Sequence, residues 1–280
     1  MAGTDAVTTD PVEAARAWAA QDPDATTRAQ LEALVARADA GDPDARAELA
    51  SRFAGRLAFG TAGLRGELGA GPLRMNRVLV AQAAAGLARF LLARETHPSV
   101  VIGYDGRTNS EVFARDTAEL MAGAGVRAIL LPRLLPTPVL AFAVRHLDAS
   151  AGVMVTASHN PAADNGYKVY LGRLDHGSQI VPPADAEIQA QIVAVASGSI
   201  AELPRSDAYE LADESVVEAY VRRTAALAGA PQPLRVVYTA MHGVGWETAR
   251  RVFETAGFTD VVSVPGLCEA VTMTPALASR

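Results

Sequence analysis

Short apolar segments alternate with amphipathic segments in the middle of the chain, and this alternation limits the fold more than any other sequence feature. Val100 to Tyr104, Val126 to Leu131 and Gly152 to Val155 are short and apolar, as buried strands are. Ser110 to Met121 and Thr137 to Leu147, which separate them, have the length and spacing of helices. Strands joined by such helices form βαβ units. We therefore expect an α/β fold with a mixed, mostly parallel sheet and helices on both faces.

Helices are expected before this core. Apolar residues recur at helical spacing over residues 11–57, and Asp22-Pro23 and Asp42-Pro43 look like helix starts, because aspartate caps a helix and proline fits its first turn. Phe59 to Gly71 contains five glycines in thirteen residues, which predicts a loop. A helix is expected from Asn76 to Ala93.

A returning strand and a second α/β unit are expected after the core. Asn165-Gly166 is a hairpin-turn dipeptide, so Tyr167 to Leu171 is predicted to return antiparallel. Residues 183–197 and 213–228 are predicted to be helices. After the Gly- and Pro-rich residues 229–233, a strand, a helix and a strand follow, at Leu234 to Thr239, Trp246 to Ala256 and Thr259 to Val264. This organisation predicts a helical extension at 1–57 packed on a first domain at 58–228, and an incomplete second domain at 229–280.

Composition excludes several classes of protein. The 280 residues carry 25 basic and 31 acidic side chains, and a net charge of −6 gives no attraction for nucleic acid or an anionic membrane. The single cysteine, Cys268, excludes an internal disulfide and a multi-cysteine zinc cluster. Met1 to Pro11 lacks the basic and apolar regions of a signal peptide, and no apolar stretch is long enough to span a membrane. These features predict a cytoplasmic protein.

Thr156 to Pro161 is the strongest candidate for a functional loop. It follows an apolar strand, and in open α/β sheets ligands bind at the carboxyl ends of strands. Lys168 lies on the predicted returning strand, which would bring its amine near Ser158. Arg65 and Arg107 belong to separate segments that would converge on the same place.

Three roles are open for Ser158. In a hydrolase it needs a base, but His159 is its immediate neighbour and would point to the opposite face of an extended backbone. As a phosphoryl carrier it would hold about two negative charges, which Arg65, Arg107 and Lys168 would balance. It is otherwise a capped, solvated turn. The cations on other segments favour the phosphoryl carrier.

Several loops, in the same order, resemble those of the α-D-phosphohexomutase superfamily, which contains phosphoglucomutases and phosphomannomutases. The similarity extends over residues 11–264. The segments that carry it are Phe59 to Gly66, Gly103 to Arg107, Pro136 to Pro138, Thr156 to Pro161, Asn165 to Lys168 and Tyr238 to Gly245.

This resemblance implies an intramolecular phosphotransferase that interconverts sugar 1-phosphates and 6-phosphates of glucose or mannose. Ser158 would be the phosphoserine that forms the bisphosphorylated intermediate, and its phosphate would ligate Mg²⁺. Lys168 would be the general base and acid, Arg65 would stabilise the transferred charge, and His159 would orient its partners. The implied groups that bind substrate or phosphate are Thr61, Gly63, Arg107 and Asn160. The implied partners are a phosphorylated sugar and a sugar bisphosphate.

The sequence departs from this family towards its end. The family's remaining magnesium ligands come from an Asp-x-Asp-x-Asp-Arg loop, and no such run follows Ser158. From Pro265 the similarity stops. These departures predict a C-terminally truncated chain that is impaired as a mutase by itself. The alternative is a non-catalytic mutase fragment that binds phosphorylated sugar or a partner.

Three other segments have competing interpretations. Asp105 and Arg107 either act directly at the site or only pair with each other to fix their loop. Met241 to Gly245 follows a strand and precedes a helix, which allows phosphate binding, although a structural turn is favoured. Gly123 to Ala128 matches a dinucleotide fingerprint but runs from helix into strand, so a helix stop is predicted.

Overall fold

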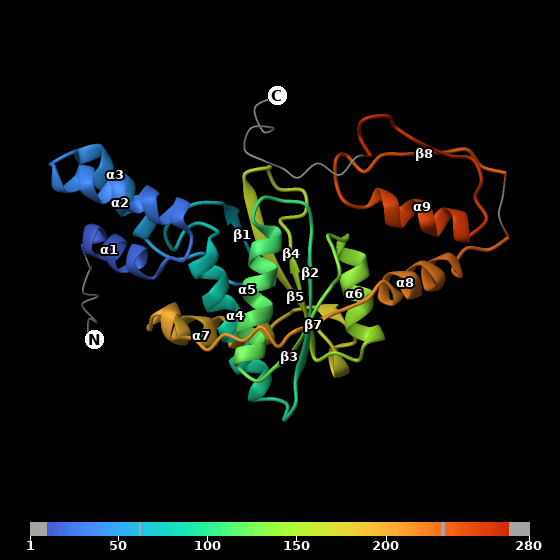
Figure 1. The fold of residues 1–280 in the computed structure, drawn as a ribbon, viewed down its shortest axis with the longest axis horizontal. Helices are drawn as coiled ribbons and strands as arrows, with labels where there is room; N and C mark the ends of the chain where they lie inside the picture. Colours follow the sequence, from blue (N-terminus) through green and yellow to red (C-terminus); the bar gives the residue numbers. More distant parts are fainter. Residues whose placement is uncertain (1–9, 62, 231–232, 269–280) are drawn as a thin grey trace.

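The computed structural model describes residues 10–61, 63–230 and 233–268 of the chain (Figure 1). A central sheet with helices on both faces occupies the middle of the molecule. Three helices lie at one end of the long axis, and a two-stranded sheet with one helix lies at the other. The expected α/β fold, with a mixed sheet between helices, is confirmed.

Within the described residues, seven strands form the central sheet. In chain order they are β1 (Leu64–Glu67), β2 (Ser99–Tyr104), β3 (Arg127–Leu130), β4 (Ala151–Val155), β5 (Asp164–Leu171), β6 (Ser178–Gln179) and β7 (Glu210–Leu211). Their spatial order is β1-β5-β4-β2-β3-β7, with β6 paired to β5. β4, β2, β3 and β7 run parallel, whereas β5 is antiparallel to β4, β1 and β6. The carboxyl ends of β2, β3 and β4 therefore meet at one edge.

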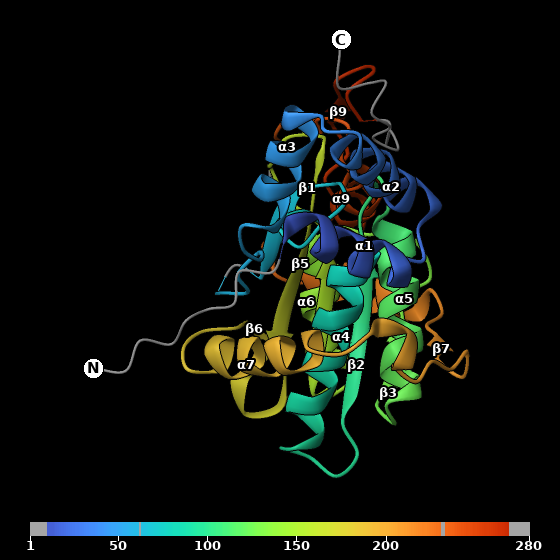
Figure 2. The ribbon, with the colours of Figure 1, turned by 90° about the vertical axis from the view of Figure 1, so that its left-hand side faces the viewer.

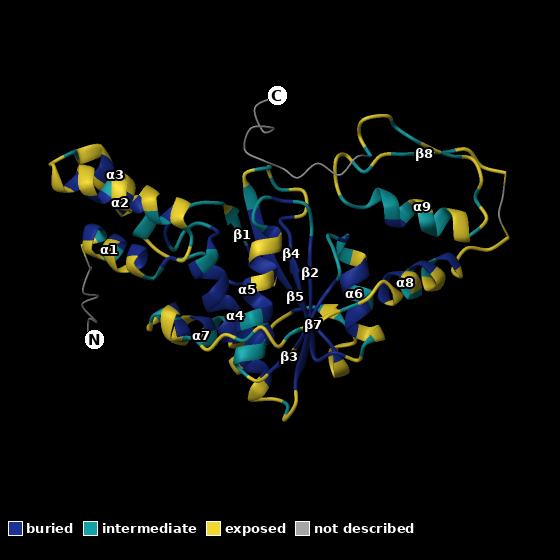
Figure 3. Cartoon of the chain, viewed as in Figure 1, coloured by how far each residue is buried: buried dark blue, intermediate teal, exposed yellow. Residues whose placement is uncertain are grey.

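Helices cover both faces of this sheet. One face carries α4 (Arg77–Leu92), α5 (Ser110–Gly123) and α7 (Ala184–Ala196), and the other carries α6 (Thr137–His146) and α8 (Ser215–Ala225). In Figure 2, α4 and α7 lie in front of the strands. A hydrophobic core lies on each face of the sheet, and β2 contributes to both, because successive side chains of a strand point to opposite faces. Val100 and Ile102 belong to the core under α4, and Val101 belongs to the core under α6. Buried residues consequently concentrate in the sheet and along the inner helix faces (Figure 3).

The N-terminal helices α1 (Pro11–Gln21), α2 (Ala25–Asp39) and α3 (Pro43–Phe53) share the core of α4. Asp42 caps α3 and Pro43 occupies its first turn, as expected. The expected start at Asp22-Pro23 is wrong, because Asp24 caps α2 instead. The buried carboxylate of Asp22 accepts hydrogen bonds from the Asp24 backbone and the Thr27 hydroxyl, which fixes the turn between α1 and α2.

The last described elements form a separate unit. β8 (Val236–Tyr238) and β9 (Val261–Ser263) pair in parallel, and α9 (Trp246–Thr255) connects them. The expected strand–helix–strand pattern is thus present. An ion pair of 2.7 Å between Arg133 and Glu247 links this unit to the loop that follows β3. Val237 and Val262 are exposed.

Two predictions about glycine-rich segments are wrong. Phe59 to Gly71, expected as a loop, contains strand β1, and the expected turn at Asn165-Gly166 lies inside β5. Gly166 pairs with Arg65 across these strands. A Cβ on Gly166 would lie 2.6 and 2.7 Å from two backbone oxygens, so glycine is needed for the close approach of the chains. The predicted helix stop at Gly125 is confirmed, with a φ of +87°.

No helix in the described ranges is both long enough and apolar enough to cross a membrane.

Close packing of α4 on α7 gives a first testable prediction. A Cβ added to Gly86 would lie 2.7 Å from the backbone nitrogen of Ile192, so the helices must separate. Overpacking costs about 1–3 kcal/mol, and exceeds the gain of about 1 kcal/mol from replacing a helical glycine by alanine. Gly86→Ala should therefore lower the urea midpoint. Gly55→Ala is the control, since its nearest neighbour would be 3.9 Å away; equal midpoints for the two variants would contradict the prediction.

Candidate active site

A cleft lies where the parallel strands end. Its volume is about 540 Å³. The loops after β2, β3 and β4 line it on one side, and the turn after β8 lines it on the other. The lining side chains that the sequence singled out are Asp105, Arg107, Ser158, His159, Asn160, Met241 and His242.

Ser158 is presented to solvent by a tight turn. Its φ is +58°, a left-handed conformation that few non-glycine residues adopt, and the residue is exposed. Its backbone N–H donates to Thr156 Oγ1 at 2.9 Å, and Thr156 Oγ1 donates to Asp105 Oδ2 at 2.6 Å. No hydrogen bond of the His159 ring is found among the described residues. The Ser–His hydrogen bond of a hydrolase is therefore not formed in this arrangement.

The Arg107 side chain fixes the loop Thr156 to Pro161, the serine loop, through hydrogen bonds. It is buried, and its guanidinium donates to the carbonyl oxygens of Ser158 and Asn160 at 2.8 and 2.9 Å. It also donates to the carbonyl oxygens of Pro161 and Asp164 at 2.8 and 2.9 Å. These four bonds use the terminal N–H groups, so none is directed at a ligand. The geometry favours loop fixing over the expected phosphate contact of Arg107.

Asp105 connects the loops after β2 and β4. Besides Thr156, it accepts hydrogen bonds from the Ser110 hydroxyl at 2.8 Å and the backbone N–H of Arg107 at 3.1 Å. Asn165 donates to Ser110 Oγ at 3.1 Å and extends the network to β5. Sequence reasoning did not identify Thr156, Ser110 or Asn165 as positioning groups. The only signal was a polar cluster at the end of each strand.

The four hydrogen bonds from Arg107 to backbone carbonyl oxygens give a second testable prediction. Lysine keeps the charge of Arg107 but has no planar fork, so Arg107→Lys loses most of the four carbonyl bonds. We expect hydrogen exchange of residues 156–164 to accelerate, and phosphoryl transfer at Ser158 to fall about 100-fold, because a displaced reacting group costs about that much. Arg115→Lys, at an exposed Arg115–Glu111 pair, is the matched control. Unchanged exchange in Arg107→Lys would exclude the positioning role.

Lys168 is the only lysine in the sequence. It lies on β5, it is 7% exposed, and no hydrogen bond or ion pair of its amine is found among the described residues. Burial lowers the pKa of Lys168, the Arg65 guanidinium lowers it further, and Asp105 acts in the opposite direction. Unlike arginine, a lysine with a lowered pKa can give up its proton.

Arg65 lies next to Lys168 on the neighbouring strand. In β1 it faces Gly166, and a Cβ there would lie 3.1 Å from Arg65 Cγ, so the glycine leaves room for the arginine stem. Arg65 Nε is buried and has no hydrogen-bond partner. A buried N–H without a partner is costly, and an anion would satisfy this one. Arg65 and Lys168 do not themselves line the cleft.

Thr61 and Gly63 form the turn that precedes β1. Gly63 has a φ of +74°, and a Cβ would lie 2.0 Å from the Tyr167 carbonyl oxygen, so only glycine fits. Thr61 is exposed, and its carbonyl oxygen accepts a hydrogen bond of 2.8 Å from Gln179. Neither residue lines the cleft. Their phosphate-binding roles stay predictions.

The described residues do not fit a magnesium site by themselves. Two carboxylates are bonded to the serine loop, and both already accept hydrogen bonds: Asp105 as described, and Asp164 from Asn160 at 2.9 Å. Within the described ranges, no group of three or more His, Cys, Asp and Glu side chains is placed to hold a metal. We derive no step through the ion.

These features define an α/β protein whose candidate site lies at the carboxyl edge of a parallel sheet. Residues 56–198 match the family model for phosphoglucomutase/phosphomannomutase, alpha/beta/alpha domain I. A Haemophilus influenzae protein named "Probable phosphomannomutase" is 61% identical over 184 residues, which are 65% of this chain and 38% of that protein. A Schizosaccharomyces pombe protein named "Probable phosphoribomutase" is 37% identical over 266 residues, which are 89% of this chain and 43% of that protein.

A solved structure gives the same assignment. The phosphomannomutase-type protein from Thermus thermophilus has a TM-score of 0.67 and 29% identity, covering 78% of this chain and 47% of that chain. The chain therefore belongs to the phosphoglucomutase/phosphomannomutase family. It spans about two fifths of the length of the two named relatives.

Proposed function

We propose that this chain carries the phosphoserine part of a phosphosugar mutase, with Ser158 as the group that holds the phosphate. The mutase interconverts sugar 1-phosphate and 6-phosphate through a bisphosphorylated sugar. In this proposal residues 58–228 form the phosphoserine domain, 1–57 an N-terminal extension, and 229–280 part of a second domain. The family assignment supports the reaction class. The proposed sugar is glucose or mannose, or a pentose whose 1-phosphate and 5-phosphate take the corresponding places.

The observation that carries the proposal is the environment of Ser158. Ser158 presents an exposed hydroxyl on a loop that Arg107 and Asp105 fix by hydrogen bonds. Lys168 is buried and has a lowered pKa on which Arg65 and Asp105 both act. The half-buried Arg65 has an Nε–H without a hydrogen-bond partner. A fixed nucleophile needs a base and a cation to accept and transfer a phosphoryl group. A solvated turn would need none of these.

Each residue has one task in the proposed transfer. The bond between phosphorus and Ser158 Oγ breaks while a bond from phosphorus to a sugar hydroxyl oxygen forms. The hydroxyl proton passes to the neutral Lys168 amine, and a proton from the resulting ammonium goes to the departing Ser158 Oγ, so that the serine leaves as a hydroxyl and the amine is neutral again. Arg65 offsets the charge on the phosphoryl oxygens, and His159 and Asn160 at the cleft orient the sugar phosphate. Catalysis consists of positioning and electrostatics, as is general for phosphoryl transfer.

The mass of the intact chain after incubation with glucose 1,6-bisphosphate tests the proposal. We expect one added phosphate, and a coupled assay then shows whether this length of chain also completes turnover. Phosphate uptake without turnover corresponds to an impaired mutase. Binding of the bisphosphate without covalent phosphate uptake would support the alternative, a non-catalytic fragment, and would exclude Ser158 as the phosphate carrier.

A further inference from the structure

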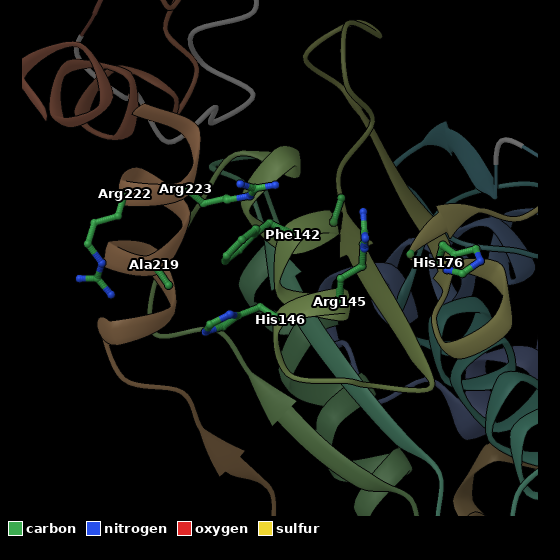
Figure 4. A pocket seen from close by; sticks show the side chains of 9 residues that line it. Phe142, Arg145, His146, His176, Ala219, Arg222 and Arg223 are labelled. Atoms are coloured by element: carbon green, nitrogen blue, oxygen red, sulfur yellow. The ribbon is translucent and has the colours of Figure 1, made fainter. Parts of the chain in front are cut away.

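A second pocket, away from the serine cleft, collects basic side chains. It lies between α6, α8 and the turn after the short 3-10 helix Arg173–Asp175, and its volume is about 830 Å³. It shares no lining residue with the serine cleft. The side chains that give it its character are Phe142, Arg145, His146, His176, Arg222 and Arg223 (Figure 4).

Two arginines of this pocket, Arg145 and Arg223, are exposed. No hydrogen bond or ion pair of the Arg145 or Arg223 side chain is found in the part of the chain that the structure describes, whereas most other arginines pair with a carboxylate. Among the described residues, no aspartate or glutamate lines the pocket. In a chain with a net charge of −6, this local excess of positive charge concentrates a field that attracts anions.

Arg145 and Arg223 line the pocket from different helices, α6 and α8. In Figure 4, Arg223 extends from α8 towards α6 and ends beside Phe142, and Arg145 extends from α6 on the other side of that ring. The Arg145 stem lies over Gly177, where a Cβ would be 2.7 Å from its Cγ. This packing restrains the stem of Arg145, whose residue is otherwise exposed to solvent and to a ligand.

Arg222 differs from its neighbour Arg223. It extends from the opposite side of α8 in Figure 4 and lies 3.7 Å from Glu218, one turn earlier. Basic residues in the last turn of a helix also interact with the helix dipole, which would explain all three arginines without a ligand. Arg222 therefore serves as an internal control, because a dipole role predicts the same behaviour for Arg222 and Arg223.

We propose that this pocket is an anion site that binds the phosphate group of a small phosphorylated molecule through Arg145 and Arg223. Guanidinium groups suit this task, because their planar N–H pairs match the oxygens of a phosphate. The half-buried Phe142 ring, which stacks on His146 with centroids 5.0 Å apart, would form the apolar wall beside the bound group.

The test follows the arginine Nε–Hε NMR signals of the full chain during titration with inorganic phosphate, and with sodium chloride at equal ionic strength. Arg145→Gln and Arg223→Gln identify the two signals. In wild type both should move with one saturable midpoint. In Arg223→Gln the midpoint of the Arg145 signal should rise about tenfold or more, because a charge-assisted hydrogen bond is lost. In Arg222→Gln it should rise far less, because this variant removes a charge of the pocket but no proposed hydrogen bond to the phosphate.

Two results would overturn this site: signals that move no further with phosphate than with chloride, or a loss in Arg222→Gln equal to that in Arg223→Gln. A parallel titration with glucose 6-phosphate distinguishes the source of the phosphate group. A lower midpoint than for inorganic phosphate assigns the site to a phosphomonoester, and equal midpoints assign it to the phosphate ion. The readout is independent of Ser158, so failure here leaves the proposed mutase chemistry untouched.

Discussion

Replacing Ser158 with alanine should abolish covalent phosphate uptake from a sugar bisphosphate. The hydroxyl oxygen is the proposed acceptor, and no neighbouring group takes over a lost nucleophile. Any mutase turnover should fall to the background level, a loss on the order of 10⁶-fold or more. Intact mass and a coupled assay measure the two effects.

The variant should fold normally. The bonds that hold the loop involve the backbone of Ser158, namely its N–H to Thr156 and its carbonyl oxygen to Arg107, and alanine keeps both. Ser51→Ala, at an exposed position of α3, is the matched control and should take up phosphate like wild type. A phosphate adduct that persists in Ser158→Ala would place the carrier elsewhere.

Lys168→Met should slow phosphoryl transfer while stabilising the fold. Removing a positioned general base costs about 10²–10⁴-fold in rate. Methionine has nearly the length of lysine without its charge, so folding no longer has to bury the ammonium or remove its proton. The variant should therefore show a higher free energy of unfolding at neutral pH, measured in urea.

The lowered pKa of Lys168 also predicts the direction in which the free energy of unfolding changes with pH. Lys168 has a folded pKa below its ordinary value of 10.5. At pH values between the folded pKa and 10.5, the unfolded chain binds more protons than the folded chain. The free energy of unfolding of the wild type should therefore rise with pH in this window. Lys168→Met should lose this rise. As the sole lysine, Lys168 can also be titrated directly by its rate of reaction with an amine reagent. A stability profile unaltered by the substitution would show that its pKa is not lowered.

The serine loop shows why positioning groups escape sequence reasoning. Ser158 is visible in the sequence because it belongs to a polar motif that follows an apolar strand. Lys168 is visible because it is a charged residue within an otherwise apolar strand. Arg107 is equally visible, but its task depends on which atoms its guanidinium meets. Those atoms are carbonyl oxygens more than 50 residues along the chain. Backbone carbonyls are present at every residue, so no sequence pattern marks them.

The basic pocket is a second example. Arg145 and Arg223 lie in different helices, and each alone is an ordinary basic residue near a helix end. Their relation appears only when α6 and α8 pack on the same face of the sheet. The unpaired state of both side chains is likewise a property of the folded chain.

By itself, the sequence determined the order and type of most elements and the location of the serine loop. Hydrophobic periodicity is local, and a strand or helix follows from a few consecutive residues. Tertiary structure decided the rest. It made strand β1 from a glycine-rich segment, because Gly63 and Gly166 let it approach β5 closely enough to pair. It turned Arg107 towards the loop and lowered the pKa of Lys168, because burial and the charge of Arg65 exist only once distant segments are packed together.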